Sequence, residues 1–188
     1  MSPKVCPAWL GSLLASPIRK LIHNPQAILT PYIKGGMTVL DIGCGMGFFS
    51  IPLAQMVGPK GKVICVDMQG KMLKGLGKRA QKAGVSARIE TRLCYQNTIG
   101  LQDLAEKVDF GLAFAVVHEI PDPLRFLAEL STTIVPSGSV LLAEPKGHVP
   151  EKEFTMTVSM AEEQGFRVIA KPRIFRSRSV LLRKEKRQ

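Results

Sequence analysis

The sequence has few cysteines and no long hydrophobic run, and each shortage excludes a class of protein. Only four of the 188 residues are cysteine, and no two of them form a CxxC pair. We therefore expect no metal site and no disulfide framework, and the simplest compartment is a reducing cytoplasm. No uninterrupted apolar run approaches about 18 residues, so no transmembrane helix is expected. Pro7 and Gly11 interrupt the short apolar N-terminal stretch, which argues against a signal peptide.

Acidic residues are scarce at both ends of the chain, and the net charge is +11. Residues 1–40 contain four basic residues and no acidic one, and residues 167–188 contain nine basic residues and one acidic one. Residues 101–163 reverse this balance, with eleven acidic and four basic residues. A basic face attracts anionic partners such as nucleic acid. A well-solvated surface is the simpler interpretation, because the aromatic residues on which single-strand binders stack bases make up only 6% of the chain.

Short apolar stretches alternate with helical patterns along the chain, which is typical of an α/β protein with a parallel sheet. Seven stretches have the composition of strands: 37–43, 62–67, 87–93, 108–116, 138–145, 166–172 and 177–184. Four helices are expected between them, over 48–57, 70–84, 122–134 and 150–165. Near-continuous apolar runs such as VLLA favour a sheet covered on both faces. The predicted fold is therefore a Rossmann-like, doubly wound sheet with helices on both faces.

The first 36 residues precede this predicted core and are interrupted by prolines. They are typical of two or three short helices cut at Pro17, Pro25 and Pro31. Their apolar residues need a surface to pack against. We therefore expect residues 1–36 to form a helical cap over the ligand site of a core that spans residues 37–184. An interfacial membrane helix and a dimer contact are the alternatives. Residues 1–188 are thus predicted to be one domain, in a monomer or a homodimer.

The stretch VLDIGCGMGFFS has the pattern of a nucleotide-binding turn. Three glycines alternate directly after a predicted strand, at Gly43, Gly45 and Gly47. Glycine allows positive φ and lets a ligand approach the backbone closely. The spacing is GxGxG, and Phe48 occupies the position of the last glycine in the GxGxxG of dinucleotide-binding enzymes. Asp41 would repel a pyrophosphate and attract an ammonium or sulfonium group, so the turn favours a ligand with a cationic end.

The second predicted strand ends at Asp67, twenty residues after Gly47. A carboxylate at this place can accept hydrogen bonds from both hydroxyl groups of a ribose, and Met68 beside it can lie against an adenine ring. An N-cap of the following helix is the alternative role for Asp67. The combination of strand, DxGxGxG turn, helix and second strand ending in Asp is far more specific than the glycines alone.

With these motifs, the sequence resembles the class I S-adenosylmethionine-dependent methyltransferases over about residues 25–184. The resemblance rests on VLDIGCGMGFFSIPLA, VICVDMQGKML, VDFGLAFAVVHEIPDP and GSVLLAEP. Within the family it is to the small-molecule subgroup that includes the quinone-biosynthesis C-methyltransferases. It implies a mostly parallel seven-stranded sheet with an antiparallel last strand. It also implies S-adenosylmethionine as the cofactor and S-adenosylhomocysteine as the product.

The resemblance implies roles for individual residues as well. The methionine part of the cofactor would be held by Asp41 and the backbone of Gly43, Cys44, Gly45 and Gly47. Asp67 would hold the ribose, Met68 would flank the adenine, and Ala115 and Val116 would line the methionine side. Asn97 stands where the family often has an acid that contacts the adenine amino group, and its carbonyl oxygen can accept that hydrogen bond.

Methyl transfer from a sulfonium is an in-line displacement, to which a protein mainly contributes positioning and exclusion of water. A base is needed only where the acceptor loses a proton, as a phenol or an activated carbon does. His118 is the best candidate, because histidine ordinarily titrates near neutral pH. Other candidates at the same predicted edge are Glu119, Asp122, Glu144, Lys146 and His148. The alternatives are a backbone hydrogen bond for His118 and a helix N-cap for Asp122.

The sequence therefore predicts a methyltransferase that acts on a small or lipophilic acceptor. The runner-up is an RNA methyltransferase that uses the basic ends of the chain, although no NPPY-like tetrapeptide for base amines is present. A cofactor-binding protein without catalysis and a nicotinamide-dependent oxidoreductase are the remaining hypotheses, because a fold alone does not decide function. The spacing HEIPD excludes the HExxH of zinc proteases.

Overall fold

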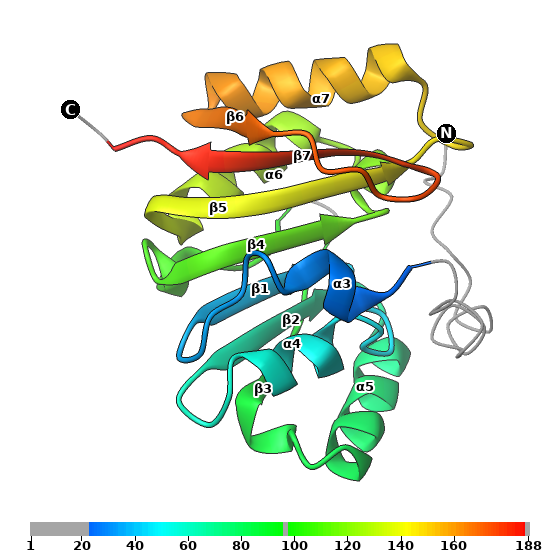
Figure 1. Cartoon of the computed structure of the whole chain (residues 1–188), viewed down its shortest axis with the longest axis vertical. Helices are drawn as coiled ribbons and strands as arrows, with labels where there is room; N and C mark the ends of the chain where they lie inside the picture. Colours follow the sequence, from blue (N-terminus) through cyan, green and yellow to red (C-terminus); the bar gives the residue numbers. More distant parts are fainter. Residues whose placement is uncertain (1–22, 96–97, 187–188) are drawn as a thin grey trace. The chain divides into compact units, whose positions relative to one another are not determined.

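The structure is a computed structural model that describes residues 23–95 and 98–186. Most of the predicted cap and the adenine-contact candidate Asn97 lie outside the described residues. The chain divides into two compact units, one ending at Cys94 and one beginning at Tyr95 (Figure 1). One domain over residues 1–188, with a cap at 1–36, stays a prediction.

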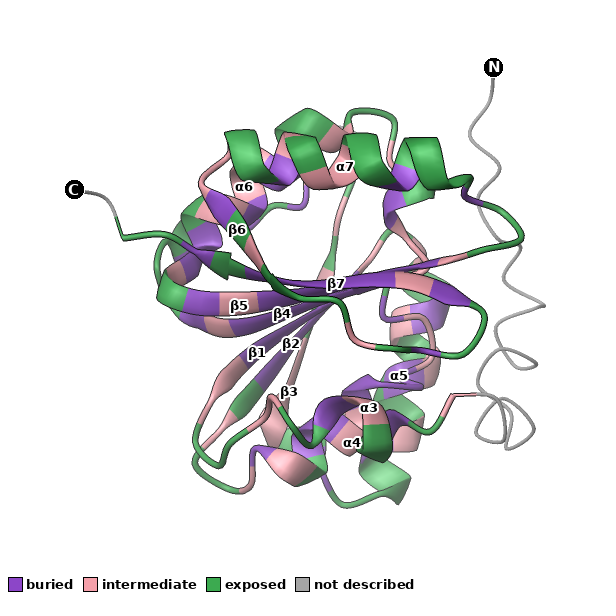
Figure 2. Ribbon diagram, turned by 45° about the horizontal axis from the view of Figure 1, so that its top comes forward, coloured by how far each residue is buried: buried purple, intermediate pink, exposed green. Residues whose placement is uncertain are grey.

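The first unit is built on three parallel strands. β1 (Thr38–Ile42) pairs with β2 (Lys62–Asp67), and β2 pairs with β3 (Ile89–Leu93). The helices are α3 (Pro25–Leu29), α4 (Ser50–Met56) and α5 (Gly70–Lys82), and the 3-10 turn η1 (Ser86–Arg88) leads into β3. β1 and β2 are buried along most of their length (Figure 2), as expected for strands with both faces covered. Leu40, Leu53, Ile64 and Leu76 are among the fully buried side chains of this core.

The second unit is built on four strands. β4 (Val108–Phe114) runs parallel to β5 (Ile134–Pro145). β7 (Ser177–Lys184) runs antiparallel to β5 and to β6 (Phe166–Ala170). The helices are α6 (Pro123–Thr133) and α7 (Glu151–Glu163), with the 3-10 turns η2 (Gln102–Leu104) and η3 (Val117–Glu119). Phe110, Leu127, Leu130 and Leu141 are fully buried in this core.

The strands follow the order β3-β2-β1-β4-β5-β7-β6 in a seven-stranded sheet. This order and the antiparallel direction of β7 confirm the predicted Rossmann-like fold class. In the described part of the chain, no helix has the length and apolar composition that crossing a bilayer requires.

Several strand boundaries depart from the prediction: β3 begins and β6 ends two residues inside the predicted ranges, and β5 and β4 depart for a visible reason. β5 begins at Ile134, where the sequence predicted the end of a helix and a strand only from residue 138. The sequence did not predict this start because Pro136 and Gly138 are poor strand formers. The start is irregular, since Ser137 has a φ of +69° and the pairing with β4 shifts between Val108 and Phe110. β4 ends at Phe114, two residues early, because the next residue leaves the strand with positive φ.

Candidate active site

The glycine turn after β1 has a backbone that favours glycine. The φ angles of Gly43, Gly45 and Gly47 are +68°, +54° and +83°. A Cβ built on Gly45 would meet no atom within 4 Å, whereas one on Gly47 would lie 2.3 Å from Cδ1 of Leu76 in α5. Gly45 therefore leaves the backbone open to a ligand. A side chain at Gly47 would force the buried side chain of Leu76 to move.

Asp67 lies beside this turn, because Ile42 pairs with Val66 and β1 and β2 end together. Its Oδ2 accepts a 2.8 Å hydrogen bond from the backbone nitrogen of Gly45, and its Oδ1 accepts one of 2.8 Å from that of Gln69. The two bonds orient the carboxylate and leave further lone pairs for a ligand. Burial raises the pKa of Asp67, and the two N–H donors partly oppose this shift. The N-cap of α5 is Gln69, so the alternative role of Asp67 as that cap is wrong.

Asp41 and Cys44 are buried beneath the turn, at 2% and 6% exposure. Oδ2 of Asp41 accepts a 2.5 Å hydrogen bond from Oγ of Ser50, the first residue of α4, so this carboxylate ties β1 to the helix. A hydrogen bond with Cys65 and burial both hold the pKa of the Cys44 thiol above its ordinary value. Cys44 is thus a neutral packing residue of the turn.

Two further residues near the strand ends of the first unit, Met68 and Cys94, are not fully buried. The side chain of Met68 is 38% exposed and so presents an apolar surface on which an adenine ring can lie. Cys94 is only partly buried, because it follows the end of β3. Desolvation raises its pKa to about 11, so its thiol is neutral as well.

In the second unit, a histidine and a glutamate that follow neighbouring strands form a close pair. His118 lies in η3 after β4, and its Nδ1 is hydrogen-bonded to Oε2 of Glu144 near the end of β5. Glu144 is 2% exposed, and its Oε1 accepts hydrogen bonds from the backbone nitrogens of Val116 at 3.1 Å and Val117 at 2.8 Å. Three donors thus compensate a buried carboxylate. The sequence analysis considered a backbone group as the hydrogen-bond partner of His118. The partner of its Nδ1 is instead the carboxylate of Glu144.

This pair sets the protonation of His118. The hydrogen bond with Glu144 raises the pKa of His118 above its ordinary value, partly opposed by burial. The charges of Glu119 and Glu153 add to the rise. Because an ionised carboxylate only accepts hydrogen bonds, Nδ1 carries the proton and Nε2 is the basic nitrogen. With 22% of its side chain exposed, His118 is the accessible member of the pair.

Ala115 joins β4 to η3 in a left-handed conformation, with a φ of +57°. This conformation is rare for alanine and marks a place where the surrounding structure determines the backbone. The backbone nitrogen of Ala115 donates a 2.7 Å hydrogen bond to the oxygen of Ala143, which holds the reversal that brings His118 to Glu144. His148 follows β5, and its ring centroid is 6.1 Å from that of His118.

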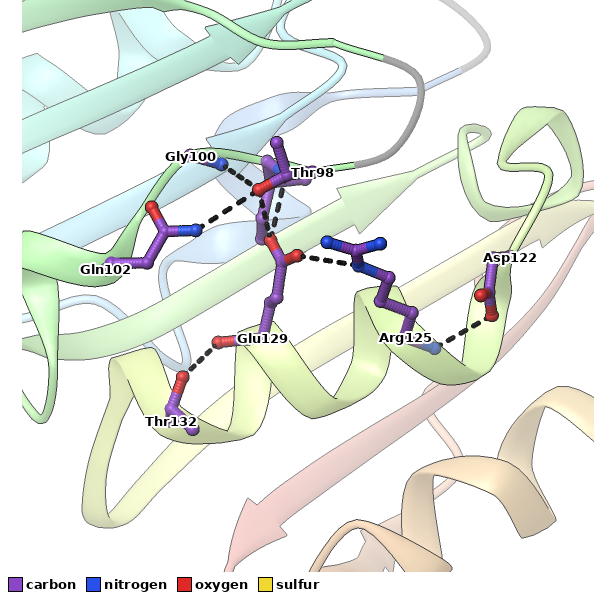
Figure 3. Close-up of polar contacts among 8 residues, drawn as sticks. Thr98, Gly100, Gln102, Asp122, Arg125, Glu129 and Thr132 are labelled. Carbon is purple, nitrogen blue, oxygen red and sulfur yellow. Dashed lines mark hydrogen bonds and ion pairs between the residues drawn. The ribbon is translucent and has the colours of Figure 1, made fainter.

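Asp122 and Glu129 serve the structure of α6 in the second unit. Asp122 is the N-cap of α6 and accepts a 3.0 Å hydrogen bond from the backbone nitrogen of Arg125 (Figure 3), which confirms the structural role considered for it. Glu129 accepts hydrogen bonds from Oγ1 of Thr98 at 3.0 Å and the nitrogen of Ile99 at 2.9 Å. Glu129 thereby fixes the start of the segment after residues 96–97, a role that the sequence analysis missed.

A family model described as a methyltransferase domain matches residues 33–175. The chain belongs to this methyltransferase family. Demethylmenaquinone methyltransferases of Bacillus cereus and Oceanobacillus iheyensis are 30% and 29% identical to it over 112 residues, which is 60% of this chain and 46% of each relative. The chain thus spans about half the length of these curated relatives, which are distant homologues.

Solved structures agree with this assignment. A methyltransferase of Aquifex aeolicus, described as dependent on S-adenosylmethionine, superposes with a TM-score of 0.84 at 27% identity, over 95% of this chain and 98% of that one. TrmN of Thermus thermophilus superposes with a TM-score of 0.66 at 22% identity, over 85% of this chain and 48% of that one, and shows the fold alone.

The cofactor of this class I methyltransferase family is S-adenosylmethionine, and the residues of the first unit fit it. The open approach to Gly45 suits a ligand that lies against the backbone, as the sequence analysis expected. The oriented carboxylate of Asp67 has lone pairs for two ribose hydroxyls, and the exposed Met68 provides an apolar surface. The assignment of individual cofactor-binding residues stays a prediction.

Proposed function

We propose that the protein transfers the methyl group of S-adenosylmethionine to a small acceptor that loses a proton in the reaction. Membership of the methyltransferase family supports the transfer. The loss of a proton by the acceptor is supported by the pairing of His118 with the buried Glu144, which is the arrangement of a general base. Methylation of an atom that carries no proton would need no base. The names of the demethylmenaquinone methyltransferases support an acceptor of low molecular mass with an apolar ring.

The residues of the first unit bind and orient the cofactor in this proposal. S-adenosylmethionine supplies an activated methyl group on a sulfonium. Asp67 accepts hydrogen bonds from the ribose hydroxyls, and the backbone nitrogen of Gly45 keeps the Asp67 carboxylate in place. The buried negative charge of Asp41 lies beneath the turn and favours the cationic end of the cofactor.

His118 removes the proton of the acceptor. Nε2 of His118 would accept the proton as the O–H or C–H bond of the acceptor breaks. The freed electron pair would bond to the methyl carbon that the cofactor supplies, and the carbon–sulfur electrons would return to sulfur. The resulting imidazolium is stabilised by the Glu144 carboxylate on Nδ1. A base positioned in this way contributes about 10²–10⁴-fold to a rate.

Calorimetric titration tests the first part of the proposal. S-adenosylmethionine, S-adenosylhomocysteine and NAD are titrated in parallel into the purified chain. We expect saturable binding of the two sulfur nucleosides and none of NAD. A screen of phenols and activated carbon acids, read as formation of S-adenosylhomocysteine, then tests the acceptor class. Folded protein that binds neither sulfur nucleoside contradicts the proposal.

RNA methylation is the second candidate function, and one observation favours it. Arg167 of β6 and Arg183 of β7 are paired residues of the antiparallel ladder, so two positive charges stand directly opposite each other. With Lys186 and the acidic Glu185 they line a groove of about 680 Å³ near the start of β5, and its excess of basic residues suits a phosphate backbone. RNA binding that weakens steeply with salt would favour this function. Absent or salt-insensitive binding would leave the small acceptor as the better proposal.

A further inference from the structure

Arg178 of β7 lies directly opposite Glu144 of β5 in the antiparallel ladder. Side chains of residues paired in this way project from the same face of a sheet. β4, β5 and β7 are adjacent strands of the second unit (Figure 1). His118, Glu144 and Arg178 therefore follow one another across three neighbouring strands, at the edge where β4 and β5 end and β7 begins. Ligands of open α/β sheets bind at this edge.

The Nε atom of Arg178 is buried and has no hydrogen-bond partner in the part of the chain that the structure describes. Glu144 lies opposite but supplies none: its Oε2 is hydrogen-bonded to His118, and its Oε1 accepts from the backbone of Val116 and Val117. A buried donor without a partner costs free energy, and proteins rarely keep one without a reason. An active site offers such a reason, because a ligand can complete the hydrogen bonding.

The chemistry of guanidinium indicates the kind of ligand group. Arginine presents planar N–H donors and a permanent positive charge, which match the oxygens of a carboxylate or a phosphate. A neutral acceptor can accept the Nε hydrogen bond but does not balance the positive charge of the guanidinium, so an anion binds more strongly. An anionic group placed on Arg178 would lie on the far side of Glu144 from His118, because β5 runs between β4 and β7. One end of an acceptor can thus be held while the other meets the base.

We propose that Arg178 binds an anionic group of the acceptor, a carboxylate or a phosphate, while His118 takes the proton from the atom that is methylated. This inference rests on the proposed function, since it names the acceptor chemistry of the same site. Arg178 is an acceptor-binding residue in this arrangement and takes no part in proton transfer.

NMR of the intact chain loaded with S-adenosylhomocysteine tests the contact directly. The Nε–H resonance of Arg178, identified by its absence in Arg178→Met, is followed during titration with benzoate, inorganic phosphate and benzamide. We expect a saturable shift with benzoate or phosphate and none with the neutral benzamide. The anion that shifts the resonance distinguishes a carboxylate site from a phosphate site. The absence of a shift with both anions, or an equal shift with benzamide, overturns the inference.

Variants separate this role from a structural one. Arg178→Met is expected to weaken benzoate or phosphate binding at least tenfold by calorimetry, and Arg178→Lys, which keeps the charge, to weaken it less. Arg173→Met removes the same charge from an exposed position before β7 and is expected to leave anion binding unchanged. The melting temperature of Arg178→Met without ligand should stay the same or rise, since the variant removes a buried unpartnered N–H. A lower melting temperature with unchanged anion binding means a structural role and overturns the inference.

Methyl transfer to a matched pair of acceptors separates a failure of the anion site at Arg178 from a failure of the proposed methyltransferase function. We expect kcat/KM to be at least tenfold higher for 3,4-dihydroxybenzoate than for its neutral amide, and Arg178→Met to abolish that preference. Equal turnover of both acceptors by the wild-type chain and by Arg178→Met overturns the inference and leaves the proposed function standing. Wild-type protein that does not bind S-adenosylmethionine contradicts the proposed function itself.

Discussion

The carboxylate of Asp67 accepts a 2.8 Å hydrogen bond from the backbone nitrogen of Gly45, twenty-two residues earlier in the chain. The end of one strand thereby holds the glycine turn that follows its neighbour. The bond uses one lone pair of Oδ2, and the carboxylate keeps others that face away from the protein's own donors. We therefore expect Asp67 to link the conformation of the turn to the binding of the ribose.

Replacement of this carboxylate should weaken cofactor binding strongly. We expect Asp67→Ala to raise the Kd for S-adenosylhomocysteine by roughly 100-fold, because hydrogen bonds to a charged group contribute about 1.5–3 kcal/mol each. Calorimetry measures the change, and circular dichroism verifies that the variant is folded. Asp67→Asn keeps one acceptor oxygen, so its Kd should lie between those of the wild-type chain and Asp67→Ala. Normal affinity of a folded Asp67→Ala would show that another residue holds the ribose.

Cofactor binding should also depend on pH through Asp67. Burial raises the pKa of this carboxyl above 3.8, and only the ionised form accepts hydrogen bonds with both oxygens. We therefore expect the affinity for S-adenosylhomocysteine to fall as the pH is lowered, with a midpoint above 3.8. Because the folded-state pKa is raised, ionisation of Asp67 also lowers the stability of the unliganded protein as the pH rises. Affinity measured against pH should be flatter in Asp67→Asn, and an identical profile would assign the titration to another group.

His118 and Glu144 should act together on turnover. We expect His118→Ala to lower kcat by about 10²–10⁴-fold, with nearly unchanged affinity for S-adenosylmethionine. Because Glu144 raises the pKa of His118 above 6.5, and because Nε2 must be unprotonated to act, kcat should rise with pH through a value above 6.5. Glu144→Gln removes the carboxylate, so the midpoint of this rise should move to lower pH. His118→Gln serves as a control that should lack the transition. Unchanged turnover of His118→Ala with the true acceptor would contradict the proposed base.

The first unit was largely predictable from the sequence, whereas the second was predictable only in outline. The glycine turn and the strand ending in Asp67 are local patterns, and local patterns dictate most of the Rossmann-like order of elements. The contact of His118 with Glu144 joins residues twenty-six positions apart, and it depends on how the loop after β4 reverses at Ala115. The position of Arg178 depends on the antiparallel register of β5 and β7, and no local pattern of residues specifies a register of this kind.

Two glycines of the same turn should respond differently to alanine. Gly47→Ala would place a Cβ 2.3 Å from Leu76 and forces positive φ on alanine, so we expect a loss of about 2–4 kcal/mol in the free energy of unfolding. Gly45→Ala carries the same conformational cost but meets no protein atom, so its loss should be only about 1 kcal/mol. The new methyl group instead occupies the open approach to the turn, and cofactor affinity should fall at least tenfold. Urea denaturation and calorimetry measure the two effects separately. Gly45→Ala that keeps full affinity would mean that the ligand does not lie against this part of the turn.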